Sequence, residues 1–185
     1  MPTAPVVAVA PLGDTSRHVV DAVARAVGEP FGREVVLAPG VQIPDSAYHP
    51  GRRQFLSTAL LDALARLRRP GWERLLGVAD VDLFVPELNF VFGEADPRRG
   101  VAVFSVNRLR WGLREDETRD RVFERRVAVE AIHELGHTYD LGHCSDPHCV
   151  MWFSNTLAES DRKGTAFCPA HTGALGAALR SRRRS

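Results

Sequence analysis

The sequence predicts an α/β fold built around one core, and three observations support this class. Segments with the period of strands alternate with segments with the period of helices along the first half of the chain. Residues 75–85 (LLGVADVDLFV) are apolar almost throughout, which is typical of a central strand covered on both faces. The chain has 185 residues, 44% of them hydrophobic, which is enough for one domain with a sizeable core.

The predicted strands are short runs of β-branched, aliphatic or aromatic residues bounded by turn residues. They cover residues 5–11, 34–37, 75–85, 90–92 and 101–106. Two prolines in residues 41–51 predict a loop there, and the Gly-Glu-Ala-Asp-Pro segment at 93–97 predicts a turn between the last two strands.

The predicted helices have apolar residues at three- and four-residue spacing. They cover residues 15–27, 53–67, 115–141 and 172–180. Thr15 or Ser16 can cap the first helix, and Gly28 is expected to end it. The helix over 115–141 is the longest, and it contains the residues that indicate chemistry.

These residues form the segment His133-Glu134-Leu135-Gly136-His137. Two histidines four positions apart lie on one face of a helix, where both can bind the same zinc ion. Glu134 then lies beside the metal, where it can act as general base toward an attacking water. His143 follows six residues after His137, and a chain that leaves the helix by a tight turn can supply it as a third ligand.

The cysteine pattern indicates a second metal site. Cys144, Cys149 and Cys168 are the only cysteines, and they lie within 25 residues. Residues 1–12 lack the basic region and cleavage site of a signal peptide, so an odd cysteine cluster favours metal ligation over disulfides. No run of about 18 apolar residues exists, so we expect a cytoplasmic protein without a membrane span.

The combined pattern resembles the archaemetzincins, which are minimal members of the metzincin zinc peptidases. It reads His133-Glu134-x-x-His137-x-x-Asp140-x-x-His143-Cys144-x4-Cys149-x-Met151, then Cys168-x-x-His171. Residues 88–95 and 103–110 also look like the edge-strand region of that family, so the resemblance covers nearly the whole chain, more loosely before residue 75.

The resemblance implies a metzincin-like fold with a small mixed twisted sheet, an active-site helix and two backing helices. A short zinc-stapled segment follows. Residues 1–143 would form the N-terminal subdomain that ends in the active-site helix. Residues 144–185 would form the C-terminal subdomain, with the two parts making one compact catalytic unit.

The resemblance also implies a role for each matching residue and two zinc ions per chain, one catalytic and one structural. The implied roles are catalytic zinc ligands for His133, His137 and His143, general base for Glu134, Met-turn residue for Met151, and structural zinc ligands for Cys144, Cys149, Cys168 and His171. Outside the resemblance, Met151 can be read as a plain core methionine.

Two positions depart from the family pattern. Asp140 stands where the family usually has a glycine in a left-handed turn, a conformation that Asp tolerates better than most residues. If the helix continued instead, Asp140 would share the face of the two helical histidines and could bind zinc itself. His171 stands where the family usually has a fourth cysteine, and His148 is a rival for that ligand position.

The leading interpretation is therefore a zinc metallopeptidase that acts on peptides or proteins, and the resemblance suggests an aminopeptidase-like preference for short peptides. Glu94 and Asn89 on the expected edge strand could place substrate, or could serve solubility. The alternative is a non-catalytic zinc module that holds a fold or a partner surface. A net charge of +1 argues against nucleic acid binding, and the arginines at 180–184 are expected to be a solvated terminus. We expect a monomer.

Overall fold

The computed structural model describes residues 5–116 and 118–181; most of the arginine-rich tail lies outside them. The strands in chain order are β1 (Val6–Leu12), β2 (Glu34–Leu37), β3 (Tyr48–His49), β4 (Gln54–Leu56), β5 (Trp72–Ala79), β6 (Leu83–Phe84), β7 (Gly93–Asp96) and β8 (Val101–Ser105). The α-helices are α1 (Arg17–Phe31), α2 (Ser57–Leu67), α3 (Arg119–His137), α4 (Leu157–Ser160) and α5 (Pro169–Ser181), with short 3-10 helices at Asp45–Ala47 and Arg108–Arg110.

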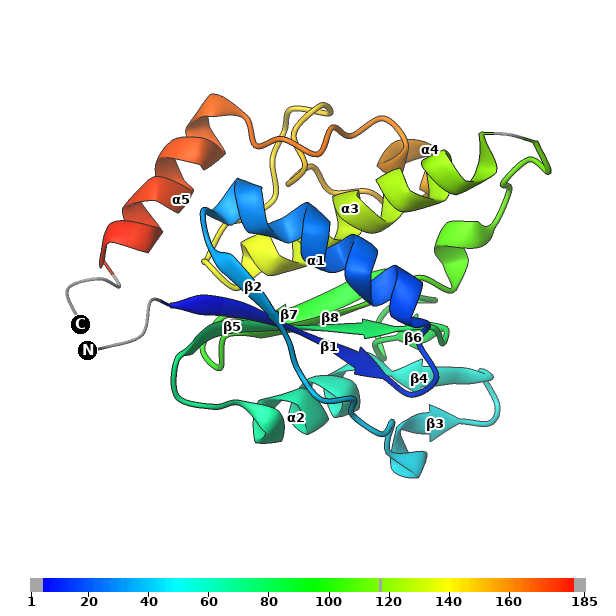
Figure 1. The fold of residues 1–185 in the computed structure, drawn as a ribbon. Coiled ribbons are helices and arrows are strands. Elements are labelled where there is room, and N and C mark those ends of the chain that lie inside the picture. Colours follow the sequence, from blue (N-terminus) through cyan, green and yellow to red (C-terminus); the bar gives the residue numbers. More distant parts are fainter. Residues whose placement is uncertain (1–4, 117, 182–185) are drawn as a thin grey trace.

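In the described part of the chain, the larger sheet has five strands in the order β2-β1-β5-β8-β7. Neighbouring strands are parallel except for β7, which pairs antiparallel with β8 at one edge. Helices α1 and α3 cover one face of this sheet and α2 covers the other (Figure 1). This confirms the predicted α/β class, with a mixed sheet, an active-site helix and two backing helices.

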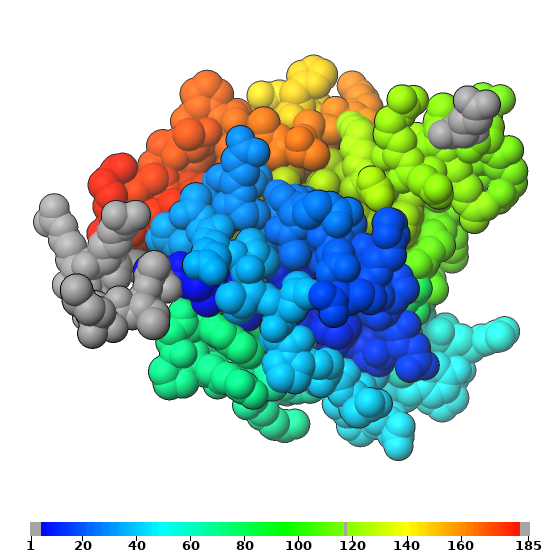
Figure 2. All heavy atoms as spheres, in the orientation of Figure 1, coloured from blue at the N-terminus to red at the C-terminus, as the bar shows by residue number. Residues whose placement is uncertain are grey.

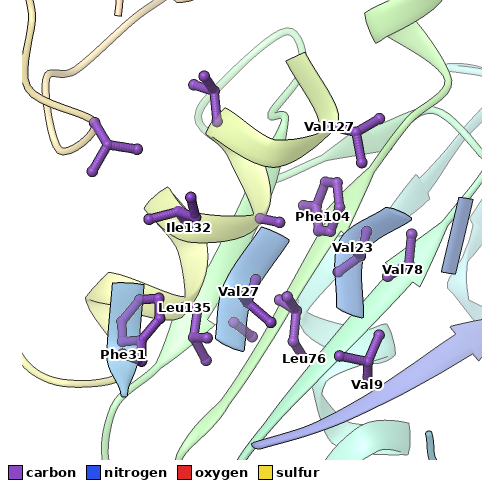
Figure 3. Close-up of a cluster of buried hydrophobic side chains, with 14 of the residues drawn as sticks. Val9, Val23, Val27, Phe31, Leu76, Val78, Phe104, Val127, Ile132 and Leu135 are labelled. Atoms are coloured by element: carbon purple, nitrogen blue, oxygen red, sulfur yellow. The ribbon is translucent and has the colours of Figure 1, made fainter. Parts of the chain in front are cut away.

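From residue 75 to its end, the central strand β5 is apolar on both sides, and both of its faces are buried there. Leu76 and Val78 point to the core beneath α1 and α3, where Phe104, Val27 and Ile132 also pack (Figure 3). The alternate residues of β5 belong to a second cluster on the α2 side. Burying apolar surface stabilises a fold by about 25 cal/mol per Å², so these two buried layers are the main source of stability.

The predicted strand over 75–85 is wrong in its extent. β5 ends at Ala79, and β6 belongs to a small sheet with the order β3-β4-β6. Asp80 and Asp82 interrupt the run, because their carboxylates form 2.6 Å ion pairs with Arg110 and Arg108. The helix predicted over 53–67 also begins later, at Ser57, since the three residues of β4 pair with β3 and β6.

The strand predicted at 90–92 and the turn predicted at 93–97 are wrong in position, because the strand lies where the turn was expected. Residues Gly93–Asp96 form β7, whose composition is unusual for a strand, and pairing with β8 stabilises it there. The turn follows β7, where Gly100 N–H donates to the Asp96 carbonyl at 2.9 Å. β7 is therefore the edge strand next to the predicted metal ligands.

Helix α1 does not end at Gly28 as predicted but continues to Phe31, and Gly32 closes it in the left-handed region with φ 56°. The extra turn buries Phe31, which stacks on Tyr139 and meets Phe167 edge to face. In the space-filling view the orange and red C-terminal segment lies directly against this end of α1 (Figure 2). No helix among the described residues is long and apolar enough to span a membrane.

Candidate metal centre and catalytic cleft

The last turns of α3 position the first two predicted metal ligands. Ile132 and Leu135 of this helix face the core, so the side chains of His133 and His137 project from another side of the helix. α3 ends at His137 rather than running to residue 141 as predicted. Asp140 then adopts φ 62°, and this left-handed residue turns the chain so that His143 approaches the other two histidines.

The histidines at 133, 137 and 143 form a compact group, called here the three-histidine group. One ring nitrogen from each lies within 4.8 Å of the others, and the Nε2 atoms of His133 and His137 are 3.1 Å apart. A tetrahedral zinc ion with bonds of about 2.0–2.1 Å would separate two ligating nitrogens by about 3.3 Å. The geometry of the group therefore fits zinc. Asp140 is not a member of the group.

Backbone carbonyls orient the two helical histidines. His133 Nδ1 lies 2.8 Å from the Val150 carbonyl, and His137 Nδ1 lies 2.7 Å from the Leu141 carbonyl. Each carbonyl accepts a hydrogen bond from Nδ1–H, so each ring keeps its Nε2 lone pair for a metal. Burial lowers the pKa of His133 well below its usual range and that of His137 to about 4, so both rings are neutral at neutral pH.

Glu134 lies beside this group at a cavity of about 810 Å³. Burial, together with the nearby Glu130 carboxylate, raises the pKa of Glu134 well above its usual range, while the charge of Lys163 lowers it. Strand β7 passes directly over Glu134: a Cβ on Gly93 would lie 2.6 Å from Glu134 Cγ and 2.6 Å from the Val103 carbonyl oxygen. Only glycine permits this close approach of strand and carboxylate.

Met151 packs against the helix that carries the ligands. It is fully buried, and a Cβ on Gly136 would lie only 2.6 Å from its Sδ atom. The glycine inside the His133–His137 segment is therefore needed for the methionine to approach α3. Met151 is also a member of the hydrophobic core, so the structure fits both the Met-turn role that the resemblance implies and a plain core methionine.

The second candidate site is formed by Cys144, Cys149, Cys168 and His171, called here the cysteine group. The Sγ atoms of Cys144 and Cys168 are 3.8 Å apart, and His171 Nδ1 lies 3.2 Å from Cys168 Sγ and 3.9 Å from Cys149 Sγ. A tetrahedral zinc ion would separate two thiolate sulfurs by about 3.8 Å and a sulfur from a nitrogen by about 3.6 Å. The cysteine group fits zinc.

The structure distinguishes the two candidate histidines for this group. His171 belongs to it, whereas His148 is exposed and lies outside it. Hydrogen bonds from the backbone and ring of His171 lower the pKa of Cys168 to about 6, which favours the thiolate that binds metal. The cysteine that is buried, Cys149, has its pKa raised to about 11 by that burial.

Lys163 is a residue of the cleft that sequence reasoning missed. It is 1% exposed, and its ammonium lies 3.9 Å from the carboxylate of Glu130, which also accepts a 2.6 Å hydrogen bond from Ser160. Both charged residues line the cavity behind Glu134. The one available signal was compositional, since Lys163 is the only lysine among 24 basic residues.

Glu94 and Asn89 both line the cavity, as expected for residues near the edge strand. The carboxylate of Glu94 is engaged by hydroxyls of the first turn of α2, from Ser57 and, at 3.1 Å, from Thr58. The Asn89 backbone carbonyl accepts a 2.9 Å hydrogen bond from Gln54. These contacts tie the cavity wall to α2 and to the small sheet.

Comparisons with known proteins point in one direction. The sequence model of peptidase family M54 matches residues 15–176. The archaemetzincin of Methanopyrus kandleri is 43% identical over 150 residues, which cover 81% of this chain and 82% of the relative. The archaemetzincin of Thermococcus kodakarensis is 36% identical over 170 residues, with 89% and 91% covered.

Solved structures agree with these relatives. The crystal structure of the Methanopyrus kandleri archaemetzincin superposes with a TM-score of 0.82 at 38% identity, covering 97% of this chain and 99% of that one. The crystal structure of a zinc-dependent peptidase from Methanocorpusculum labreanum gives a TM-score of 0.81 at 27% identity, covering 91% and 99%.

Proposed function

Because this chain belongs to peptidase family M54, the archaemetzincins, and is a zinc metallopeptidase, we propose that its three-histidine group holds the catalytic zinc ion and that Glu134 is the general base. One observation carries this proposal. His133 and His137 each bind a backbone carbonyl through Nδ1, and their Nε2 atoms lie 3.1 Å apart. The buried carboxylate of Glu134 lies beside them in a large cavity. A purely structural metal site has no need of that carboxylate or of the cavity.

Zinc, when bound, supplies a Lewis acid that polarises the scissile carbonyl and lowers the pKa of the attacking water. Glu134 takes the proton from that water and delivers it to the leaving nitrogen. Burial favours the protonated carboxyl, and the Lys163 ammonium opposes this effect, so the side chain can hold the proton between the two steps. Gly93 lets β7 lie close enough to keep the carboxylate in place.

We place the substrate along β7. This strand is the edge of the larger sheet and residues of it line the cavity, so an extended peptide can pair with its outer side. The preference for short peptides or amino termini stays a prediction. Glu94 could place substrate, but its carboxylate already accepts hydrogen bonds from α2 hydroxyls, so it does not support this preference. The family membership does not favour the alternative of a non-catalytic zinc module.

We propose that the cysteine group holds a second, structural zinc ion. Residues 1–143 and 144–185 would then form one catalytic unit, with the ligands of the two ions adjacent at His143 and Cys144. The fit of the thiol and imidazole distances to a tetrahedral ion supports this. Metal content tests both sites. Zinc-loaded wild-type protein should hold two ions per chain, while His137→Ala and Cys168→Ala should each hold one.

The same variants test the division of labour between the sites. His137→Ala should lose chelator-sensitive peptide hydrolysis together with its ion. A wild-type protein that binds a single zinc, or a His137→Ala variant that hydrolyses peptides as fast as the wild type, would contradict the proposal.

A further inference from the structure

The third histidine of the catalytic group is held differently from the other two. His133 and His137 belong to α3, whereas His143 follows the helix in a turn and is exposed. Its ring lies against His133 and Phe153, with centroids 5.5 Å and 4.8 Å away. The position of its ring therefore depends on the backbone of residues 140–143.

Two consecutive carbonyls of that turn accept hydrogen bonds from imidazoles of different sites. The Leu141 carbonyl is 2.7 Å from His137 Nδ1, and the Gly142 carbonyl is 3.0 Å from His171 Nε2. His171 faces the thiols with its other nitrogen, at 3.2 Å from Cys168 Sγ. When Nδ1 is the ligand of a metal, the proton of the ring resides on Nε2, so His171 is the donor to Gly142.

We propose that His171 is a positioning residue for the catalytic metal as well as a ligand of the second one. The Gly142 carbonyl and the His143 N–H belong to the same planar peptide unit. A hydrogen bond to that carbonyl fixes the plane from which His143 extends. This inference rests on the proposed function, because it requires both groups to bind metal.

The side chain at position 171 decides whether the hydrogen bond to the Gly142 carbonyl can form. A cysteine there would offer one ligating atom and no second donor, so the cysteine group would remain complete while the bond to Gly142 disappeared. With histidine, filling the cysteine group fixes the ring and hence the turn that carries His143. By linkage, metal in each group then raises the affinity of the other.

The test is a zinc titration against a competing chelator, with wild type, His171→Cys and His148→Ala. His137→Ala, which keeps only the cysteine group, assigns the two affinities to their sites. His171→Cys should still hold two ions but bind the catalytic ion about tenfold more weakly, the lower end of the effect of outer-shell partners. His148→Ala changes an exposed histidine outside both groups and should bind both ions as the wild type does.

An unchanged catalytic affinity in a His171→Cys protein that holds two ions would overturn the inference and leave the proposed function standing. A wild type that binds no ion at the three-histidine group would overturn both. A second measurement needs no variant. Imidazole ¹⁵N NMR of the zinc-loaded wild type should show a slowly exchanging Nε2–H on His171, and an unprotonated Nε2 would refute the hydrogen bond to Gly142.

Discussion

Replacing Gly93 by alanine is expected to displace the general base while leaving both metal groups intact. The new Cβ would lie 2.6 Å from the Val103 carbonyl oxygen and 2.6 and 2.7 Å from Cγ and Cδ of Glu134. Carbon atoms pack best at about 3.5–4.0 Å, so the carboxylate must retreat by about 1 Å. The contact with the Val103 carbonyl is a separate backbone clash, so β7 must also shift away from β8. The carbonyl belongs to β8, the partner strand of β7, so that strand pairing is strained while the Glu134 side chain is displaced.

The size of both effects follows from this overlap. Overpacking of a well-packed site costs about 1–3 kcal/mol, so the free energy of unfolding should fall by about that amount even though Gly93 itself is half-buried. A catalytic group misplaced by about 1 Å can cost about 10² in rate, so kcat/KM should fall by about that factor. Zinc content should stay at the wild-type value, because the closest neighbours of the new Cβ belong to Glu134 and Val103 rather than to the histidines.

The assay combines urea unfolding, zinc content and peptide hydrolysis, with Gly173→Ala as the matched control. Gly173 is exposed in α5, and a Cβ there meets nothing within 4 Å. That variant should keep its activity and gain up to about 1 kcal/mol from helix propensity. Wild-type hydrolysis and stability in Gly93→Ala would refute the role given to the contact between β7 and Glu134.

Three further predictions concern the metal groups. Asp140→Gly should retain or raise the catalytic zinc affinity, because φ 62° suits glycine better, and a marked loss of zinc would instead make Asp140 a ligand. Cys149→Ser should lower the melting temperature and expose the C-terminal segment to protease, since thiolate ligation stabilises the fold; unchanged melting would contradict this. Burial lowers the pKa of His137 from 6.5 to about 4, so the unfolded state binds more protons in that window. The metal-free protein should therefore lose stability as pH falls from 6.5 to 4, and this pH-dependent loss should be smaller in His137→Asn; equal profiles would contradict it.

The parts of the fold that the sequence predicted well are those fixed by local patterns. The valine-rich run of β1 and the short strand Glu34–Leu37 were predicted from their apolar residues, and the structure confirms both. The helix that carries His133 and His137 is also present, although it is shorter than predicted and ends at His137. The candidate ligands were found because their spacing along one chain segment already implies one helix face and one turn.

The errors arise where distant residues decide the local structure. Gly28 looked like a helix end, but burial of Phe31 against Tyr139 extends α1 by a turn. The residues of β7 have little strand propensity of their own and become a strand because β8 lies beside them. Lys163 was not predicted in the cleft because its buried partner, Glu130, is far away in the sequence.

The most direct test of the account is peptide-library hydrolysis by the zinc-loaded wild type and by Glu134→Gln at equal zinc content. Glutamine keeps the size and polarity of the side chain but cannot accept a proton. The variant should retain its fold and both ions, and hydrolysis should fall by about 10² or more, the usual scale of general base catalysis. Equal hydrolysis by the two proteins, or no hydrolysis by a wild type with both groups filled, would contradict the mechanism.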